Sequence, residues 1–148
     1  MPSTNKKLDF SSLEKAHTSL GKAIKRSKEN LQDEELRDAV IHRFKCTDIL
    51  CWKMLKRQME LESPSPAIID SLNFRDLLRE AAEKGLIDNI EKWFVYREQR
   101  NITSHTYDQK KATSVQKTAF DFFDDANNLI LNLKKRFPNP ICLTKLTW

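Results

Sequence analysis

Residues that break helices are scarce in this chain, and that scarcity limits what it can fold into. Its 148 residues include only two glycines and five prolines, whereas charged residues make up 32% and hydrophobic residues 39%. Turn-rich sheets use glycine and proline at many turns, but long amphipathic helices need few of either. The sequence therefore predicts an all-α protein, and its length is typical of one domain spanning residues 1–148.

Apolar residues recur at helical spacing along most of the chain. The pattern predicts long helices over residues 10–26, 33–61, 90–105 and 111–137. A loop is expected after "ESPSP", because proline cannot donate a hydrogen bond inside a helix, and a short helix over 74–84 then ends at Gly85. Four main helices and one short helix predict an up-and-down four-helix bundle with a core over about residues 8–137.

Two apolar surfaces are expected to find a partner. The last helix carries a wide apolar face, which leaves room for a homodimer interface. Beyond it, "PNPICLTKLTW" is separated from the helix by two prolines and is too apolar to be a comfortable free end. Residues 138–148 are therefore predicted to dock on the bundle or on another subunit.

The sequence predicts neither a membrane segment nor a bound metal or cofactor. No apolar run approaches the roughly 20 residues that cross a bilayer, and "MPSTNKKLDF" lacks the hydrophobic stretch of a signal peptide, so we expect a cytoplasmic protein. His42 and Cys46 are four residues apart, but two ligands do not define a zinc site. The net charge of +5 favours an acidic partner such as RNA.

The stretch "REQRNITSHTYD", residues 97–108, gathers polar side chains where a helical pattern is about to break. On a regular helix they form two neighbouring rows, one of Arg97, Asn101 and His105 and the other of Arg100, Ser104 and Tyr107. Arg100 and His105 converge only if the arginine reaches across or the helix loosens near the histidine. The alternative interpretation is structural, because the helix dipole favours a histidine near a helix C-terminus.

This combination suits chemistry on a phosphodiester. Cleaving RNA without a metal requires proton transfer at the ribose hydroxyl and at the leaving oxygen, and positive charge at the phosphate. A histidine transfers protons near neutral pH, and an arginine grips two phosphate oxygens at once. Since one histidine cannot be acid and base simultaneously, a two-fold dimer with two motifs across one cleft is the natural arrangement.

Two longer stretches resemble the nucleotidyltransferase substrate-binding proteins of the HEPN superfamily. In "DAVIHRFKCTDILCWKMLKRQME" the signature positions are Arg43, Phe44, Asp48, Trp52, Lys53, Leu55 and Lys56. "LLREAAEKGLIDNIEKWFVYREQRNITSHTYD" resembles the other half of the signature, and the likeness spans roughly residues 8–137. The resemblance implies a small helical bundle, usually dimeric, that is paired with a minimal nucleotidyltransferase.

Within this family the chain is similar to the HepT toxins, which carry R-x-x-x-x-H-x-Y and are implied to be metal-independent ribonucleases. The resemblance implies that Arg100 and His105 are the catalytic pair and that Tyr107 is the residue modified with AMP by the partner, MntA in those systems. The candidate supporting residues are Asn101, Arg97, Ser104 and Asp48. Adenylate on Tyr107 would place bulk and negative charge two residues from His105, where it opposes an RNA phosphate.

Two other interpretations remain open at this point. The same polar cluster suits a non-catalytic subunit that binds a nucleotide or presents substrate to the nucleotidyltransferase. It also suits a structural homologue in which the motif only stabilises a helix end.

Overall fold

The computed structural model describes residues 9–103 and 107–136, and every regular element in these ranges is an α-helix. The all-α prediction is therefore confirmed. The elements are α1 (Ser11–Glu29), α2 (Glu34–Glu62), α3 (Pro66–Ser71), α4 (Phe74–Glu83), α5 (Ile90–Ile102) and α6 (Gln109–Arg136). The predicted docking of residues 138–148 concerns a segment outside the described residues.

Local capping explains where several helices begin and end. The side chain of Asp33 accepts hydrogen bonds from two backbone amides at the start of α2, and Asn73 and Asn89 cap α4 and α5 in the same way. After α4, Gly85 has φ +78°, a left-handed conformation that glycine adopts without strain. The amide of Leu86 then bonds back to the carbonyl of Ala81, which closes the end of α4.

The expectation of a plain loop after "ESPSP" is wrong. Residues Pro66–Ser71 form the short helix α3, so the described part of the chain holds two short helices where one was predicted. Proline is tolerated in the first turn of a helix, because its missing N–H would have no partner there. Lys56 of α2 also lies 2.8 Å from Asp70, which ties α3 to the bundle.

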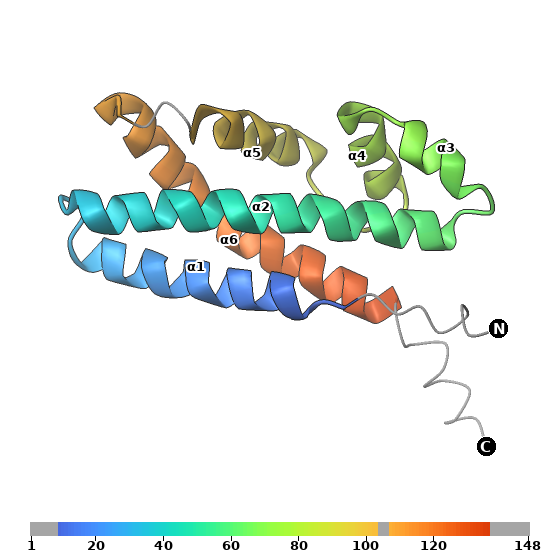
Figure 1. Ribbon diagram of the computed structural model, residues 1–148, viewed down its shortest axis with the longest axis horizontal. Helices are drawn as coiled ribbons and strands as arrows, with labels where there is room; N and C mark the ends of the chain where they lie inside the picture. The colour runs from blue at the N-terminus through green and yellow to red at the C-terminus, as the bar shows by residue number, and fades with distance from the viewer. Residues whose placement is uncertain (1–8, 104–106, 137–148) are drawn as a thin grey trace, which may run out of the picture.

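Helix α2 is the centre of the bundle, because it contacts each of the other five helices. Figure 1 shows α1 antiparallel beside it, α4 and α5 along its opposite side, and α6 passing obliquely behind it. The aromatic core joins α2, α5 and α6, where the ring of Phe122 meets Phe44, Trp93 and Tyr96 edge to face. Among the described helices, none combines the length and the apolar character that a membrane span requires.

Candidate functional site

An ion pair between α2 and α5 holds the arginine of the R-x-x-x-x-H motif. Nε of Arg100 lies 3.0 Å from Oδ2 of Asp48, a contact between charges that lacks the alignment of a hydrogen bond. Only 16% of the Arg100 side chain and 9% of the Asp48 side chain are exposed. Because Asp48 contacts the inner nitrogen of the guanidinium, the two outer nitrogens lie further along the side chain. Those nitrogens form the fork that suits phosphate.

Burial changes the chemistry of Asp48. It raises the pKa of this carboxyl from 3.8 to about 6, while the positive charges of Arg100 and Arg97 lower the pKa in part. Cys51, one turn further along α2, is also buried, and burial raises the pKa of its thiol. This part of α2 is therefore a poorly solvated environment in which the charge of Asp48 is maintained by arginines.

Arg97 lies against aromatic rings, one turn before Arg100. Its guanidinium carbon is 4.2 Å from the ring centre of Phe74 and 5.7 Å from that of Trp52. The two rings are themselves 4.8 Å apart. Burial, and the neighbouring charge of Arg100, lower the pKa of Arg97. Trp52 is thus half-buried between a ring and a cation, which agrees with a packing role more than with a free surface for stacking bases.

The two tyrosines of the chain differ sharply in environment. Tyr96 is 2% exposed, and its hydroxyl donates a hydrogen bond to a carboxylate oxygen of Asp125. Burial and this hydrogen bond raise the pKa of Tyr96. Tyr107 is 85% exposed. Of the two phenol groups, therefore, the one in the motif is the one open to an external enzyme.

The remaining motif residues lie around the end of α5. Asn101 is exposed in the last turn of α5, and the hydroxyl of Thr103 donates to the carbonyl oxygen of Arg100, 2.7 Å away. Ser104 and His105 lie outside the described residues. The convergence of Arg100 with His105 therefore stays a prediction, whereas the pairing of Arg100 with Asp48 is observed.

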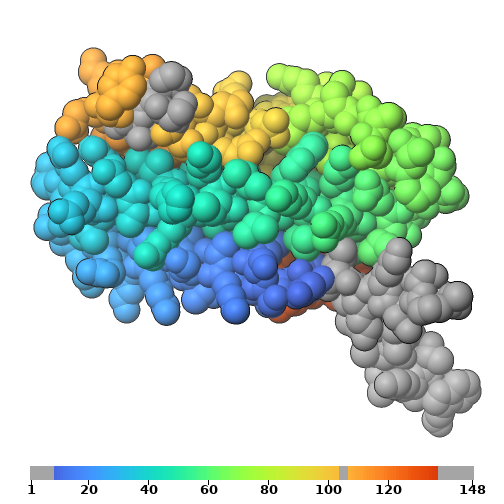
Figure 2. All heavy atoms as spheres, viewed as in Figure 1, coloured from blue at the N-terminus to red at the C-terminus, as the bar shows by residue number. Residues whose placement is uncertain are grey.

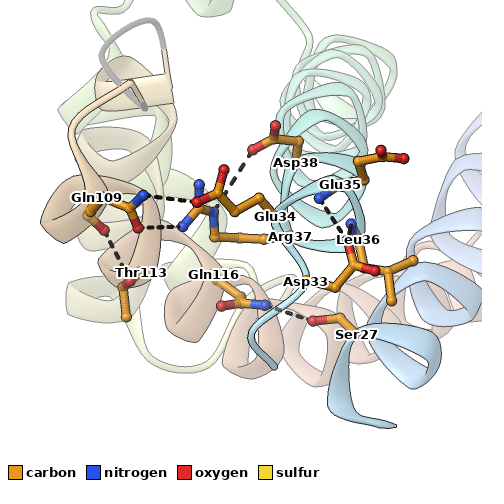
Figure 3. A network of polar contacts seen from close by, with 10 residues as sticks. All are labelled: Ser27, Asp33, Glu34, Glu35, Leu36, Arg37, Asp38, Gln109, Thr113 and Gln116. Atoms are coloured by element: carbon orange, nitrogen blue, oxygen red, sulfur yellow. Dashed lines mark hydrogen bonds and ion pairs between the residues drawn. The ribbon is translucent and has the colours of Figure 1, made fainter. Parts of the chain in front are cut away.

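A polar network fastens the start of α6 to the start of α2, and sequence reasoning did not find it. The side-chain amide of Gln109 accepts from Arg37 at 3.1 Å and donates to Glu34 at 2.9 Å, as Figure 3 shows. Figure 2 shows the first turns of α6, in orange, lying over the beginning of α2. No local pattern signals such contacts, since the partners are far apart in the sequence.

Several family-signature positions on α2 have structural roles. Phe44 and Leu55 are fully buried in the core. Arg43 donates from Nη1 to the carbonyl oxygen of Ser19, 2.9 Å away, and so joins α2 to α1.

Nε2 of His42 and Sγ of Cys46 are 3.7 Å apart. Within residues 9–103 and 107–136, no cluster of three or more His, Cys, Asp or Glu side chains could hold a metal ion.

Comparison with known proteins identifies the family of the chain. The family described as "Nucleotidyltransferase substrate binding protein like" matches residues 8–135. A curated protein of Haemophilus influenzae, named Probable ribonuclease HepT, is 42% identical over 96 residues, which are 65% of this chain and 66% of that protein. The chain thus spans slightly less than two thirds of this relative's length.

A solved structure has the same fold. It belongs to a Haemophilus influenzae protein and is described as revealing the fold of a substrate-binding domain of a nucleotidyltransferase. The two chains superpose with a TM-score of 0.81 at 33% sequence identity, over 85% of this chain and 99% of the other.

Proposed function

The chain belongs to the family of nucleotidyltransferase substrate-binding proteins, and on that premise we propose that it is the HEPN toxin subunit of a two-gene module. It would cleave RNA in the cytoplasm without a metal, and a partner nucleotidyltransferase would silence it by adenylylating Tyr107. The single observation that carries the proposal is the placement of Arg100, which is held by Asp48 and is followed by an accessible Tyr107.

The proposed cleavage is an internal transfer at phosphorus. The ribose 2′-oxygen attacks the adjacent phosphorus, the bond to the 5′-oxygen breaks, and that oxygen takes up a proton. His105 would move the protons, and the outer nitrogens of Arg100 would stabilise the charge on the phosphate. Because one histidine cannot do both proton transfers at once, the proposal includes a homodimer in which each subunit supplies one motif.

Supporting roles follow from the contacts around Arg100. Asp48 fixes the inner end of the guanidinium, and Arg97 adds a second positive charge nearby that partly balances Asp48. Asn101 and Ser104 would assist as polar groups beside the phosphate. The proposed mechanism uses these side chains without a metal or a cofactor.

RNA cleavage by the purified, unmodified protein tests the catalytic part of the proposal. Arg100→Ala and His105→Ala are expected to lose cleavage and cellular toxicity, while Arg79→Ala, on the exposed side of α4, keeps both. The assay is done in the presence of a chelator. Intact RNA with the unmodified wild type, together with unchanged toxicity of both motif variants, would rule the ribonuclease out.

Intact mass after co-expression with the neighbouring nucleotidyltransferase tests the modification. A gain in whole adenylate units is expected in the wild type and in Tyr96→Phe, because the Tyr96 hydroxyl is buried and bonded to Asp125. The gain should disappear in Tyr107→Phe. These two variants are matched, since each removes one phenol oxygen from a chain that has two tyrosines.

A second candidate function is a non-catalytic subunit that binds a nucleotide or presents substrate to the nucleotidyltransferase. The observation in its favour is the solved relative, which is described as a substrate-binding domain. A stable complex with the partner, no mass gain, no cleavage, and nucleotide binding that is lost in Arg100→Ala would favour this candidate.

A further inference from the structure

A polar groove lies along α2 beside Tyr107, and the proposed function gives it no role. Its volume is about 390 Å³, and residues from α2 and from both sides of the α5–α6 connection line it. Pockets for small ligands usually range from roughly 300 to 1,000 Å³. The groove therefore has the size of a site for one small molecule, and Tyr107 is on its wall.

The α2 side chains in the groove form one row. Glu34, Asp38, His42 and Lys45 recur every three or four residues, so they share a face of the helix over about 16 Å. All four are exposed. The row is acidic at its beginning and carries an ammonium and an imidazole at its end, so it offers acceptors to one part of a ligand and a positive charge to another.

The floor of the groove includes a constrained arginine. Only 11% of the Arg37 side chain is exposed, and it is held by Gln109 at 3.1 Å and by Asp38 at 3.8 Å. Within the described part of the chain, its Nε is buried and has no hydrogen-bond partner. The positive charge of Arg37 therefore offsets part of the negative charge of Glu34 and Asp38 at this end of the groove.

The two ends of the groove have different surroundings. At the acidic end, Gln109 joins α6 to α2 through Glu34 and Arg37 (Figure 3). At the other end, Lys45 precedes Asp48 by three residues, which is about 4.5 Å along the helix axis. A ligand that reaches Lys45 would therefore lie about one helical turn from Asp48, the partner of Arg100.

We propose that this groove holds the adenylate that is attached to Tyr107, an inference that rests on the function proposed above. The Tyr107 oxygen would attack the α-phosphorus of ATP, pyrophosphate would leave, and the phenol proton would pass to solvent. The resulting phosphodiester carries one negative charge, which lies against Lys45 and His42. The adenine amino group and the ribose hydroxyls are donors, and they face the carboxylates of Glu34 and Asp38.

This placement explains how a modification at an exposed tyrosine would silence a largely buried arginine. A freely moving adenylate would cover the approach to Arg100 only part of the time. An adenylate held along α2 as far as Lys45 stays about one helical turn from Asp48, where its charge and bulk would oppose an RNA phosphate that approaches Arg100. Binding in the groove would thus keep the attached adenylate in one position, where it blocks the approach of RNA to Arg100.

Enzymatic removal of the adenylate from the purified, modified protein tests the groove. Wild type, Lys45→Glu and Lys53→Glu are each modified by co-expression and confirmed by intact mass, and helix content is checked by circular dichroism. Lys45 lines the groove, whereas Lys53 is exposed elsewhere on α2 and serves as the matched control. A venom phosphodiesterase is expected to release AMP at least tenfold faster from Lys45→Glu than from wild type or Lys53→Glu.

The histidine signals in NMR spectra give a second measurement. Modification of the wild type is expected to shift the ring signals of His42, but not those of His17, which is stacked on Phe123 with ring centres 4.1 Å apart. Equal release rates in all three proteins and unchanged His42 signals would rule out binding of the adenylate in the groove, but they would not contradict adenylylation itself. A protein that gains no mass at all would instead overturn the proposed function on which the groove rests.

Discussion

The carboxylate of Asp48 lies 3.0 Å from Nε of Arg100, and this contact joins the middle of α2 to the end of α5. The motif arginine is therefore largely buried, beside a carboxyl whose pKa is raised by burial. Stability, its pH dependence and the cleavage proposed above should therefore all depend on this pair.

The pH dependence of stability should change in Asp48→Asn. Because the pKa of Asp48 is about 6 in the folded protein and near 3.8 when unfolded, the folded state binds the proton more tightly. This contribution to stability is fully present below pH 3.8 and is lost as the pH rises through 6. Urea unfolding should show the wild type losing up to about 3 kcal/mol relative to Asp48→Asn between pH 4 and pH 7. If the stability of the wild type relative to Asp48→Asn stays constant or increases as the pH rises, the assignment is contradicted.

Arg100→Lys should reduce the proposed RNA cleavage at least tenfold, although the charge is kept. Lysine is a single charged point and lacks the planar fork, so it cannot contact Asp48 and bind a phosphate bidentately at the same time. Single-turnover cleavage of a labelled RNA measures the effect, and Arg79→Lys is the control. Equal rates for wild type and Arg100→Lys would mean that the fork has no part in the reaction.

Removing one hydroxyl should lower the free energy of unfolding much more at Tyr96 than at Tyr107. Tyr96→Phe removes a buried donor to Asp125, and hydrogen bonds to charged groups contribute about 1.5–3 kcal/mol. Tyr107→Phe changes a side chain that is 85% exposed, so the free energy of unfolding should move by less than about 0.5 kcal/mol. Denaturant unfolding of both variants checks this, and a larger effect at Tyr107 would contradict it.

The effect of Gly21→Ala on the free energy of unfolding should depend on which residue occupies position 123. A Cβ at Gly21 would lie 2.8 Å from Cε1 of Phe123, whose ring is stacked on His17. Alanine has a higher helix propensity than glycine by about 1 kcal/mol. With Phe123 present, the cost of displacing its ring should cancel or exceed this gain. In Phe123→Ala the same substitution should stabilise by about that amount. A double-mutant cycle from thermal or urea unfolding measures the coupling, and additive effects would refute it.

The sequence by itself determined the helices, because their signals are local. The apolar spacing along α2 and α6, the capping residues Asp33 and Asn89, and Gly85 after α4 each act within a few residues of chain. The family resemblance also singled out Arg100, Asp48 and Tyr107. It was the short helix after "ESPSP" that the local signals failed to predict, since proline both ends one helix and begins the next.

Only the tertiary structure decided how these residues meet. Periodicity shows that a side chain faces inward, but it does not show which residue of another helix it will contact. The packing of α5 on α2 pairs Arg100 with Asp48, and the packing of α5 on α4 places Arg97 over Phe74. The packing of α6 on α2 forms the groove in which an adenylate at Tyr107 would lie. Charge, burial and pKa at this site are therefore properties of helix packing, since each depends on neighbours that are distant in the chain.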